Sequence, residues 1–346
     1  MSFQTVYCTY NNLEEAFCFK EEEPQYKALY NLCYHYSDVI IDLPDDEIKL
    51  RLLKDPLIKA FIKREHSEFH GLPRFFTDLK EERLETYPND FIICEEVDDF
   101  CEKTFEEKGV FISNTNLLPK LFKTLQNHSF EKSLNLNDDS HTHNYYSWEN
   151  LLKENVLSPC NCAVIVDNYL FEKYNSFKNE NLFSIVKHLI PDRLDVPFHL
   201  TLVTDNREAK QDKNFFSKTL IPELYDHIKS TTGKEIQIEV VTHSMNPQIH
   251  QRAILLSHFL ISSEKGFNIF IDGIVKSETV YYSDWNYFKI EKFNEGFKGD
   301  LKIDRNRNYL NVIRKQIEKS REGKDFAGRQ DFWVSNIETS TNRIFS

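Results

Sequence analysis

A histidine and an arginine lie two positions apart in a segment whose apolar residues predict a β-strand. His250 and Arg252 would point to the same face of that strand, because alternate side chains of a strand share a face. An imidazole and a guanidinium on one face can grip a phosphate group together. The pair therefore predicts phosphate binding, or catalysis if His250 acts as a nucleophile. The alternative is a hydrogen-bonded pair at a sheet edge.

The segment 249–270 resembles the HxK/HxR signature of phospholipase D-like domains. It is similar to the HDR…GxxxF segment of the phospholipase D-like C-terminal domain of MIT-domain proteins, which bacterial, defence-associated proteins share. The resemblance covers roughly residues 160–295 and includes Gly266-Phe267-Asn-Ile-Phe270. Two positions depart from the family pattern. Gln251 stands where these relatives carry Asp, and Ser257 stands where the motif places its acid.

The resemblance implies a degraded catalytic site. In active members the histidine attacks phosphorus, and two copies of the motif act as nucleophile and general acid. This chain has one copy, so activity would need a symmetric dimer that joins two His250 side chains. Asp167 ends an apolar strand and is expected at the carboxyl edge of the sheet, where open α/β sheets bind ligands. It would support the site by pairing with Arg252, or would cap the following turn.

The C-terminal region is locally basic. Residues 297–330 hold ten Lys or Arg and five Asp or Glu, and residues 307–322 predict an amphipathic helix. The expected phosphate-binding residues on it are Arg305, Arg307, Arg314, Lys315, Lys319 and Arg321. Tyr309 and Trp333 would lie nearby to stack on bases. The alternatives are a solvated surface helix or a dock for the acidic N-terminal unit of the chain.

Acidic residues follow two predicted strands near the N-terminus. Asp42 follows one of them, and Asp98 belongs to the acids that follow the other. Carboxylates at neighbouring strand ends suit Mg²⁺ or Mn²⁺, as in PIN-type nucleases. The alternative is that the acids of these clusters lie in the first turns of helices and are stabilised by the helix dipole, which fits Asp45 to Glu47 and Asp98 to Asp99. The sequence indicates no other cofactor.

Composition narrows the class of protein. A chain of 346 residues exceeds the usual size of one hydrophobic core, so we expect two domains. Its 9 glycines form neither GxGxxG nor GxxxxGK[ST], which excludes the commonest glycine-loop nucleotide sites.

Residues 1–140 carry 16 Lys or Arg and 28 Asp or Glu, so the whole net charge of -12 resides there. We predict an acidic α/β domain over 1–130, a polar linker over 131–147 and a phospholipase D-like domain over 148–346.

The order of the predicted elements indicates an α/β fold. Apolar strands at 162–167, 197–204 and 236–242 alternate with helices, which predicts a mainly parallel sheet. Residues 250–260 and 266–274 are expected as two further strands, joined in a hairpin by 262–266. In the first domain we predict strands at 38–43, 90–94 and 109–113, a helix at 98–108, and a helix from Pro44 that breaks at Pro56.

These features favour a phosphate-recognising module, a nucleic-acid-binding component of a bacterial defence or mobile-element system. Anionic phospholipid headgroups are the alternative ligand. A second hypothesis is a nuclease or phosphodiesterase that uses paired His250 residues or a carboxylate-held metal. A third is an adaptor whose acidic domain binds a protein partner. The seven scattered cysteines form no CxxC motif, and we expect them to be reduced thiols. The N-terminal residues lack a signal-peptide pattern. We therefore expect a cytoplasmic location.

Overall fold

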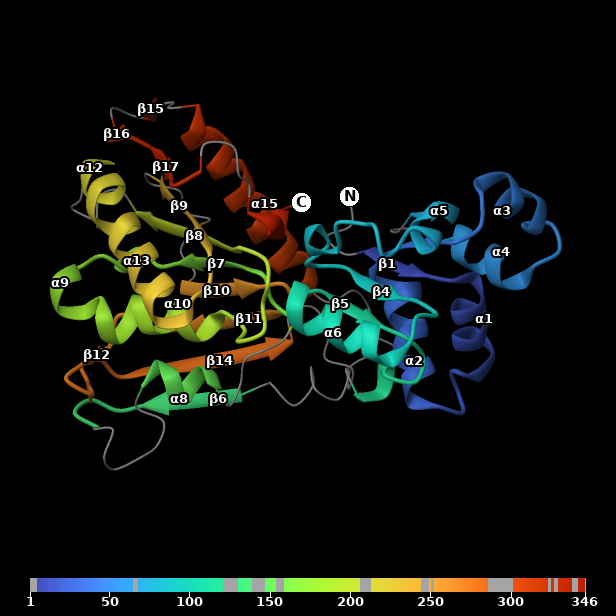
Figure 1. Cartoon of the computed structure of the whole chain (residues 1–346), viewed down its shortest axis with the longest axis horizontal. Helices are drawn as coiled ribbons and strands as arrows, with labels where there is room; N and C mark the ends of the chain where they lie inside the picture. The colour runs from blue at the N-terminus through green and yellow to red at the C-terminus, as the bar shows by residue number, and fades with distance from the viewer. Residues whose placement is uncertain are drawn as a thin grey trace. The chain divides into compact units, whose positions relative to one another are not determined.

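The computed structural model shows an α/β protein whose chain divides into two compact units, coloured blue to cyan and green to red in Figure 1. Unit 1 contains the described residues from 5 to 120, and unit 2 contains those from 130 to 345. The structure describes residues 5–64, 68–120, 130–138, 147–153, 159–205, 213–243, 249, 252–285, 301–322, 325–326, 329–337 and 342–345. Within these ranges, no helix is both long and apolar enough to cross a membrane.

Unit 1 is built on a five-stranded sheet in the order β3-β2-β1-β4-β5, in which every described pair is parallel. Its strands are β1 (Thr5–Cys8), β2 (Asp38–Ile41), β3 (Phe69–Gly71), β4 (Phe91–Ile93) and β5 (Phe111–Ser113). The helices are α1 (Tyr10–Phe19), α2 (Pro24–Asn31), α3 (Asp45–Arg51), α4 (Pro56–Ile62), α5 (Pro73–Thr77) and α6 (Asp98–Lys108). Because the strands are parallel, the segments that follow them all begin at one edge of the sheet.

Local signals in the sequence explain where two of these helices begin and end. The predicted break at Pro56 is confirmed, since α3 ends at Arg51 and α4 begins at Pro56. Asp55 caps α4, and its Oδ1 accepts a 2.8 Å hydrogen bond from the Leu57 N–H. The predicted helix over 98–108 is also confirmed, and Gly109 ends it with a φ of 63°.

Unit 2 contains an eight-stranded sheet in the order β17-β9-β8-β7-β10-β11-β14-β6. Its strands are β6 (Phe130–Leu134), β7 (Cys162–Val166), β8 (Phe198–Asp205), β9 (Ile236–His243), β10 (Arg252–Leu256), β11 (Phe259–Ser263), β14 (Thr279–Trp285) and β17 (Trp333–Ser335). The predicted strands that became β7, β8 and β9 are confirmed and run parallel to one another. They are almost wholly buried, which explains the continuous apolar run of β7, while β8 and β9 alternate apolar with polar residues over part of their length.

Three expectations for unit 2 differ from the structure. The sheet is mixed and not mainly parallel, because the other described pairs in it are antiparallel. The hairpin prediction is wrong: β10 and β11 are the paired strands, and they turn at Ser257-His258 and not at 262–266. The expected linker differs in its first part, since β6 pairs with β14 as a strand of this sheet; residues 139–146 lie outside the described residues.

Unit 2 also contains helices. They are α8 (Trp148–Lys153), α9 (Tyr174–Phe177), α10 (Ser184–Leu189), α12 (Lys213–Phe215), α13 (Ile221–Thr232) and α15 (Leu301–Arg321). Short strand pairs complete the unit: β12 (Phe270–Ile271) with β13 (Ile274–Val275), and β15 (Asp325–Phe326) with β16 (Arg329–Gln330). Both α13 and α15 contact β9, and Figure 1 shows α15 beside β9 and β17. The buried stripe on α15 includes Leu310, Ile313 and Ile317, as the sequence predicts.

Candidate functional site

Asp167 lies at the carboxyl end of β7 and holds a distant loop in place. Its side chain is 1% exposed. Oδ1 accepts a 2.9 Å hydrogen bond from the Tyr169 N–H, and Oδ2 accepts a 2.8 Å bond from the Phe267 N–H. Burial raises the pKa of the carboxyl group, and the two N–H donors act against that rise. Asp167 therefore caps its own turn and also anchors the loop after β11.

Gly266 explains why this loop can approach the carboxylate. Its φ is 101°, a conformation that side chains rarely adopt, and a Cβ at this position would lie 2.5 Å from Asp167 Oδ2. Further hydrogen bonds hold the glycine, since Ser263 Oγ and Tyr281 Oη donate to its carbonyl at 2.7 and 2.9 Å. The loop is thus fixed against the end of β7.

Arg252 begins β10 and lies at the same edge as Asp167. Ala253 pairs with Val166 in the antiparallel register, which brings the preceding residue of β10 beside the residue that follows β7. Arg252 Nη1 donates to the carbonyl of Glu264, and its guanidinium carbon lies 5.2 Å from the centre of the Tyr169 ring. The positive charge of Arg252 also lowers the pKa of Asp167, though less than burial raises it. The expected partner His250 lies outside the described residues, as does Gln251.

Two polar residues that we did not single out in the sequence end the neighbouring strands. Asp205 ends β8 and His243 ends β9, and the two are paired in register. Both are buried, and His243 Nε2 lies 3.1 Å from Asn168 Oδ1 at the end of β7. Each directly follows a strand that the sequence predicts. Open α/β sheets bind ligands at the carboxyl ends of their strands, so the argument that singled out Asp167 would also have found these two residues.

The first half of α15 passes close to this edge. Tyr309 is 6% exposed, and its hydroxyl pKa is raised chiefly by burial and further by the negative charge of Asp167. The electrostatic effect of Asp167 on Tyr309 indicates that this part of the helix lies near the end of β7. Arg305 and Arg307 belong to the same half of the helix.

The four other expected phosphate-binding residues of α15 fall into two classes. Arg314 and Lys315 lie on the exposed face, where Arg314 forms a 3.4 Å ion pair with Glu318. Lys319 and Arg321 instead each pair with a buried carboxylate, although about a third of each side chain is exposed. Lys319 Nζ lies 3.4 Å from buried Asp331.

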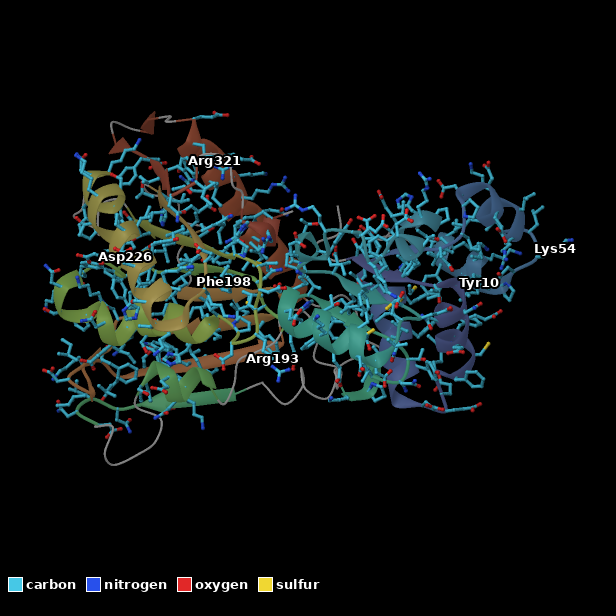
Figure 2. All side chains as sticks on the ribbon, viewed as in Figure 1. Tyr10, Lys54, Arg193, Phe198, Asp226 and Arg321 are labelled. Atoms are coloured by element: carbon cyan, nitrogen blue, oxygen red, sulfur yellow. The ribbon has the colours of Figure 1, made fainter. Side chains whose placement is uncertain are left out.

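Arg321 connects the helix to the sheet (Figure 2). Its Nη2 lies 3.3 Å from the buried carboxylate of Glu239 on β9, and its guanidinium carbon lies 4.9 Å from the centre of the Trp333 ring. Trp333 Nε1 donates to the same carboxylate at 2.7 Å. The Tyr309 ring is buried, so it is not available to stack on bases as expected, whereas Trp333 is partly exposed and its stacking role stays a prediction.

Ser257 does not join the site. It follows β10 at the opposite edge of the sheet, because Leu256 at the end of β10 pairs with Ala163 near the start of β7. It lies five positions along the extended chain from Arg252, a span of about 16 Å. Its buried hydroxyl lies 3.7 Å from Cys162 Sγ. The residue that takes the place of the motif's acid is therefore not beside Arg252.

In unit 1 the two predicted metal ligands have separate hydrogen-bond partners. Asp42 Oδ1 accepts a 2.6 Å bond from the Tyr10 N–H at the start of α1, as expected of an acid at a helix N-terminus. Asp98 Oδ1 accepts a 2.6 Å bond from Asn114 Nδ2. The strands that precede them, β2 and β4, lie on opposite sides of β1. The structure therefore does not bring these two carboxylates together as a pair.

A cavity of about 500 Å³ nevertheless opens at the carboxyl edge of this sheet. We call it the acidic cavity. It is lined by Asn12, Cys94, Glu95, Glu96, Val97, Asp98, Asn114, Thr115 and Asn116. Asp42 is not among them. Across the described ranges, no group of three or more His, Cys, Asp or Glu side chains is arranged to hold a metal ion.

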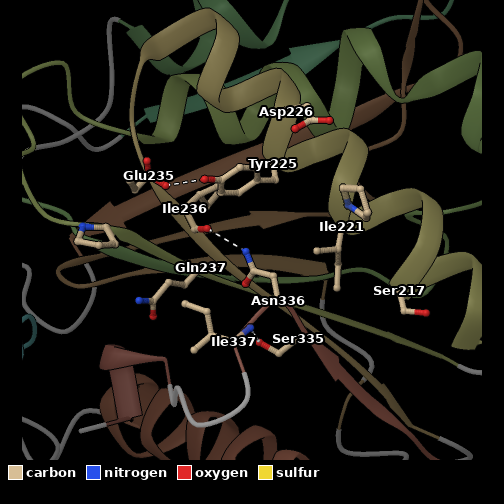
Figure 3. Close-up of a pocket in the computed structure, with 12 residues that line it drawn as sticks. Ser217, Ile221, Tyr225, Asp226, Glu235, Ile236, Gln237, Ser335, Asn336 and Ile337 are labelled. Atoms are coloured by element: carbon tan, nitrogen blue, oxygen red, sulfur yellow. Dashed lines mark hydrogen bonds between the residues drawn. The ribbon is translucent and has the colours of Figure 1, made fainter.

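A second cavity, of about 570 Å³, lies in unit 2 at the start of β9 (Figure 3). Figure 3 shows Tyr225 bonded to Glu235 and Asn336 bonded to the Ile236 carbonyl, at 2.7 and 3.1 Å. The lining contains Asp226 and Glu235 but no Lys or Arg. This cavity is therefore poorly suited to a phosphate, and it lies at the opposite end of the parallel strands from Arg252.

No model of a known protein family matches the chain, and no curated protein is significantly similar to it in sequence.

Proposed function

We propose that the carboxyl edge of the unit 2 sheet binds phosphate groups, and that nucleic acid is the polyanion that carries them. The observation that supports this most is the common location of Arg252 and the first half of α15 beside Asp167. The phospholipase D-like relationship and a role in bacterial defence are part of the proposal, and they rest on the sequence resemblance.

Arg252 is suited to contact an anion because its position is fixed before a ligand arrives. Among the described residues, the Glu264 carbonyl is the one acceptor to which its side chain donates, so further N–H groups remain for a phosphate oxygen. The Tyr169 ring supports the guanidinium from one side. An arginine held in this way loses little side-chain entropy when it binds.

The groups near Arg252 favour a binding role over hydrolysis, because none of those described is placed to act as a catalytic acid or base. Both oxygens of Asp167 accept backbone hydrogen bonds, so this carboxylate already has a structural function. Ser257 is at the other edge of the sheet. An enzyme would therefore have to depend on His250, with a second copy of the chain supplying the other histidine.

A metal-dependent nuclease in unit 1 is the second candidate, and the acidic cavity is the observation that favours it. Glu95, Glu96 and Asp98 offer carboxylate oxygens at the carboxyl edge of a parallel sheet, the ligands that Mg²⁺ and Mn²⁺ prefer. A metal would have to draw these carboxylates together, since they are not arranged as a ligand group in the structure.

Salt-dependent binding of a labelled oligonucleotide, followed by fluorescence anisotropy, tests the proposal. We expect Arg252→Ala to weaken binding about tenfold and to reduce the slope of log K against log salt by about 0.7, as for one lost phosphate contact. Lys315→Ala should lower the slope similarly, whereas Lys49→Ala, at an exposed site in unit 1, should leave it unchanged. Absence of salt-dependent binding to DNA and RNA would refute the proposal.

Two added measurements separate the alternatives. Binding to anionic vesicles but not to oligonucleotides would indicate a lipid headgroup as the source of the phosphate. Cleavage that EDTA abolishes and that Arg252→Ala retains would indicate the acidic cavity. Binding of a basic protein without binding of either polyanion would favour an adaptor.

A further inference from the structure

Two cysteines of unit 1 lie close together at the wall of the acidic cavity. Cys94 follows β4 and Cys101 lies in the second turn of α6, and their Sγ atoms are 3.7 Å apart. Both are free thiols, 2% and 0% exposed. A buried cysteine often serves only as a small apolar side chain. This pair differs because Cys94 also lines a cavity of about 500 Å³ that a small reagent can enter.

We propose that Cys94 and Cys101 form a dithiol that hydrogen peroxide oxidises to a disulfide. Cys94 is the attacking thiol and Cys101 the resolving thiol. The site is a redox modification site of unit 1 and does not depend on the proposed phosphate binding in unit 2.

The chemistry proceeds in two steps. The Cys94 sulfur attacks one peroxide oxygen, the O–O bond breaks, and the departing hydroxide takes up the thiol proton as water, which leaves a sulfenic acid on Cys94. The Cys101 sulfur then attacks the Cys94 sulfur, the S–O bond breaks, and the departing hydroxide takes up the Cys101 proton as a second water. Two thiols are oxidised and one peroxide is reduced to two waters.

The surroundings distinguish the two sulfurs. Cys94 lines the acidic cavity, whereas Cys101 is not among the residues that line it. An oxidant that enters the cavity therefore reaches the Cys94 sulfur first, and the Cys101 sulfur, 3.7 Å away, is placed to react next.

The charge of the cavity selects the oxidant. Glu95, Glu96 and Asp98 line it, and Lys80 pairs with only one of them, through a 2.9 Å contact to Glu96. Carboxylates near the entrance repel anions, so a small neutral oxidant such as peroxide is favoured over oxidised glutathione, which is large and negatively charged.

Disulfide formation requires a small movement. The sulfurs must approach by about 1.6 Å to reach a bond of about 2.05 Å. Cys101 Sγ now donates to the Glu96 carbonyl at 3.9 Å, and Asn114 Nδ2 donates to the same carbonyl at 2.8 Å. The new bond removes the first of these contacts and ties α6 to the end of β4, which alters the wall of the cavity.

Peroxide titration of the reduced full-length chain tests the proposal. We expect a mass loss of about 2 Da, and a peptide map in which Cys94 is joined to Cys101. Cys101→Ser should instead accumulate a sulfenic acid on Cys94 that dimedone labels, while Cys94→Ser should form neither product. Cys160 and Cys162 are internal controls, because both are buried, line neither of the two cavities described above, and have pKa values that burial raises, that of Cys162 to about 12.

Access to the cavity is tested without a variant. A positively charged methanethiosulfonate reagent should modify Cys94 faster than a negatively charged one of similar size, and peroxide should oxidise the pair faster than oxidised glutathione does. The proposal is overturned if peroxide leaves Cys94 and Cys101 reduced in the folded wild-type protein, or if Cys160 and Cys162 are oxidised as readily.

Discussion

The Asp167 carboxylate accepts a hydrogen bond from the backbone N–H of Phe267 at 2.8 Å, across 100 positions of sequence. The bond joins the end of β7 to the loop after β11, at the edge where Arg252 lies. It is possible because Gly266 has no side chain to keep the loop away from the carboxylate.

Gly266→Ala is accordingly expected to destabilise unit 2 by about 3 kcal/mol, from the positive φ together with the clash with Asp167. Gly233→Ala is the matched control. Its φ is 71° and a Cβ there meets nothing within 4 Å, so it should cost only about 1 kcal/mol. Urea unfolding of the two variants measures the difference. Equal losses of stability would show that the contact with Asp167 is unimportant.

Arg321 and Arg314 lie on one helix but should behave differently when each is replaced by alanine. Arg321→Ala leaves the buried Glu239 carboxylate without its cation and is expected to cost about 2 kcal/mol, since Thr201 and Trp333 still donate to that carboxylate. Arg314→Ala removes an exposed ion pair with Glu318 and should cost no more than about 0.5 kcal/mol.

Chemical denaturation measures the loss of stability in each of the two variants, and oligonucleotide binding measures whether each arginine contacts the ligand. Arg314→Ala should reduce the salt dependence of binding, whereas Arg321→Ala should leave it unchanged in protein that remains folded. The reverse pattern would mean that Arg321 contacts the ligand.

Asp90 should make the stability of unit 1 depend on pH. Burial raises the pKa of this carboxyl group to about 7, the Thr5 N–H bond at 2.8 Å opposes the rise, and the Asp38 charge adds to it. The folded protein therefore holds a proton that the unfolded chain releases near pH 4, so stability falls as pH rises from about 4 to about 7.

Asp90→Asn keeps an oxygen acceptor for Thr5 and cannot ionise. We expect its stability relative to the wild type to increase as pH rises across that window and to change no further above it, as urea midpoints at several pH values will measure. Asp46→Asn, at a side chain that is 95% exposed, is the control and should show no such gain. A constant difference between Asp90→Asn and the wild type would contradict the assignment.

The sequence predicted elements that carry their own signals. An apolar run identified β7, and period-two alternation identified β9. Pro56 marked a helix start, and Gly109 marked a helix end. Elements that depend on distant partners were missed. Strand β6 has polar residues at its centre and pairs with β14, while the turn at Ser257-His258 is buried and contains neither glycine nor proline.

The same distinction applies to the candidate site. The position of Asp167 at the end of a strand followed from the apolar run before it. The inward pairing of Arg321 could not be predicted, because Glu239 lies 82 positions away in a buried strand. A count of charges along the chain cannot distinguish a cation that pairs with a buried carboxylate from a cation that faces only solvent.

The placement of β6 has a consequence for separating the two units. Because β6 covers β14, a fragment that begins at residue 148 would leave β14 as an open edge, with the backbone N–H and C=O groups that now pair with β6 exposed. Open strands of this kind pair with other copies and aggregate. A fragment that begins near residue 127 retains β6. If only the shorter fragment is insoluble, the cause is the unprotected edge of β14 and not an inability of unit 2 to fold alone.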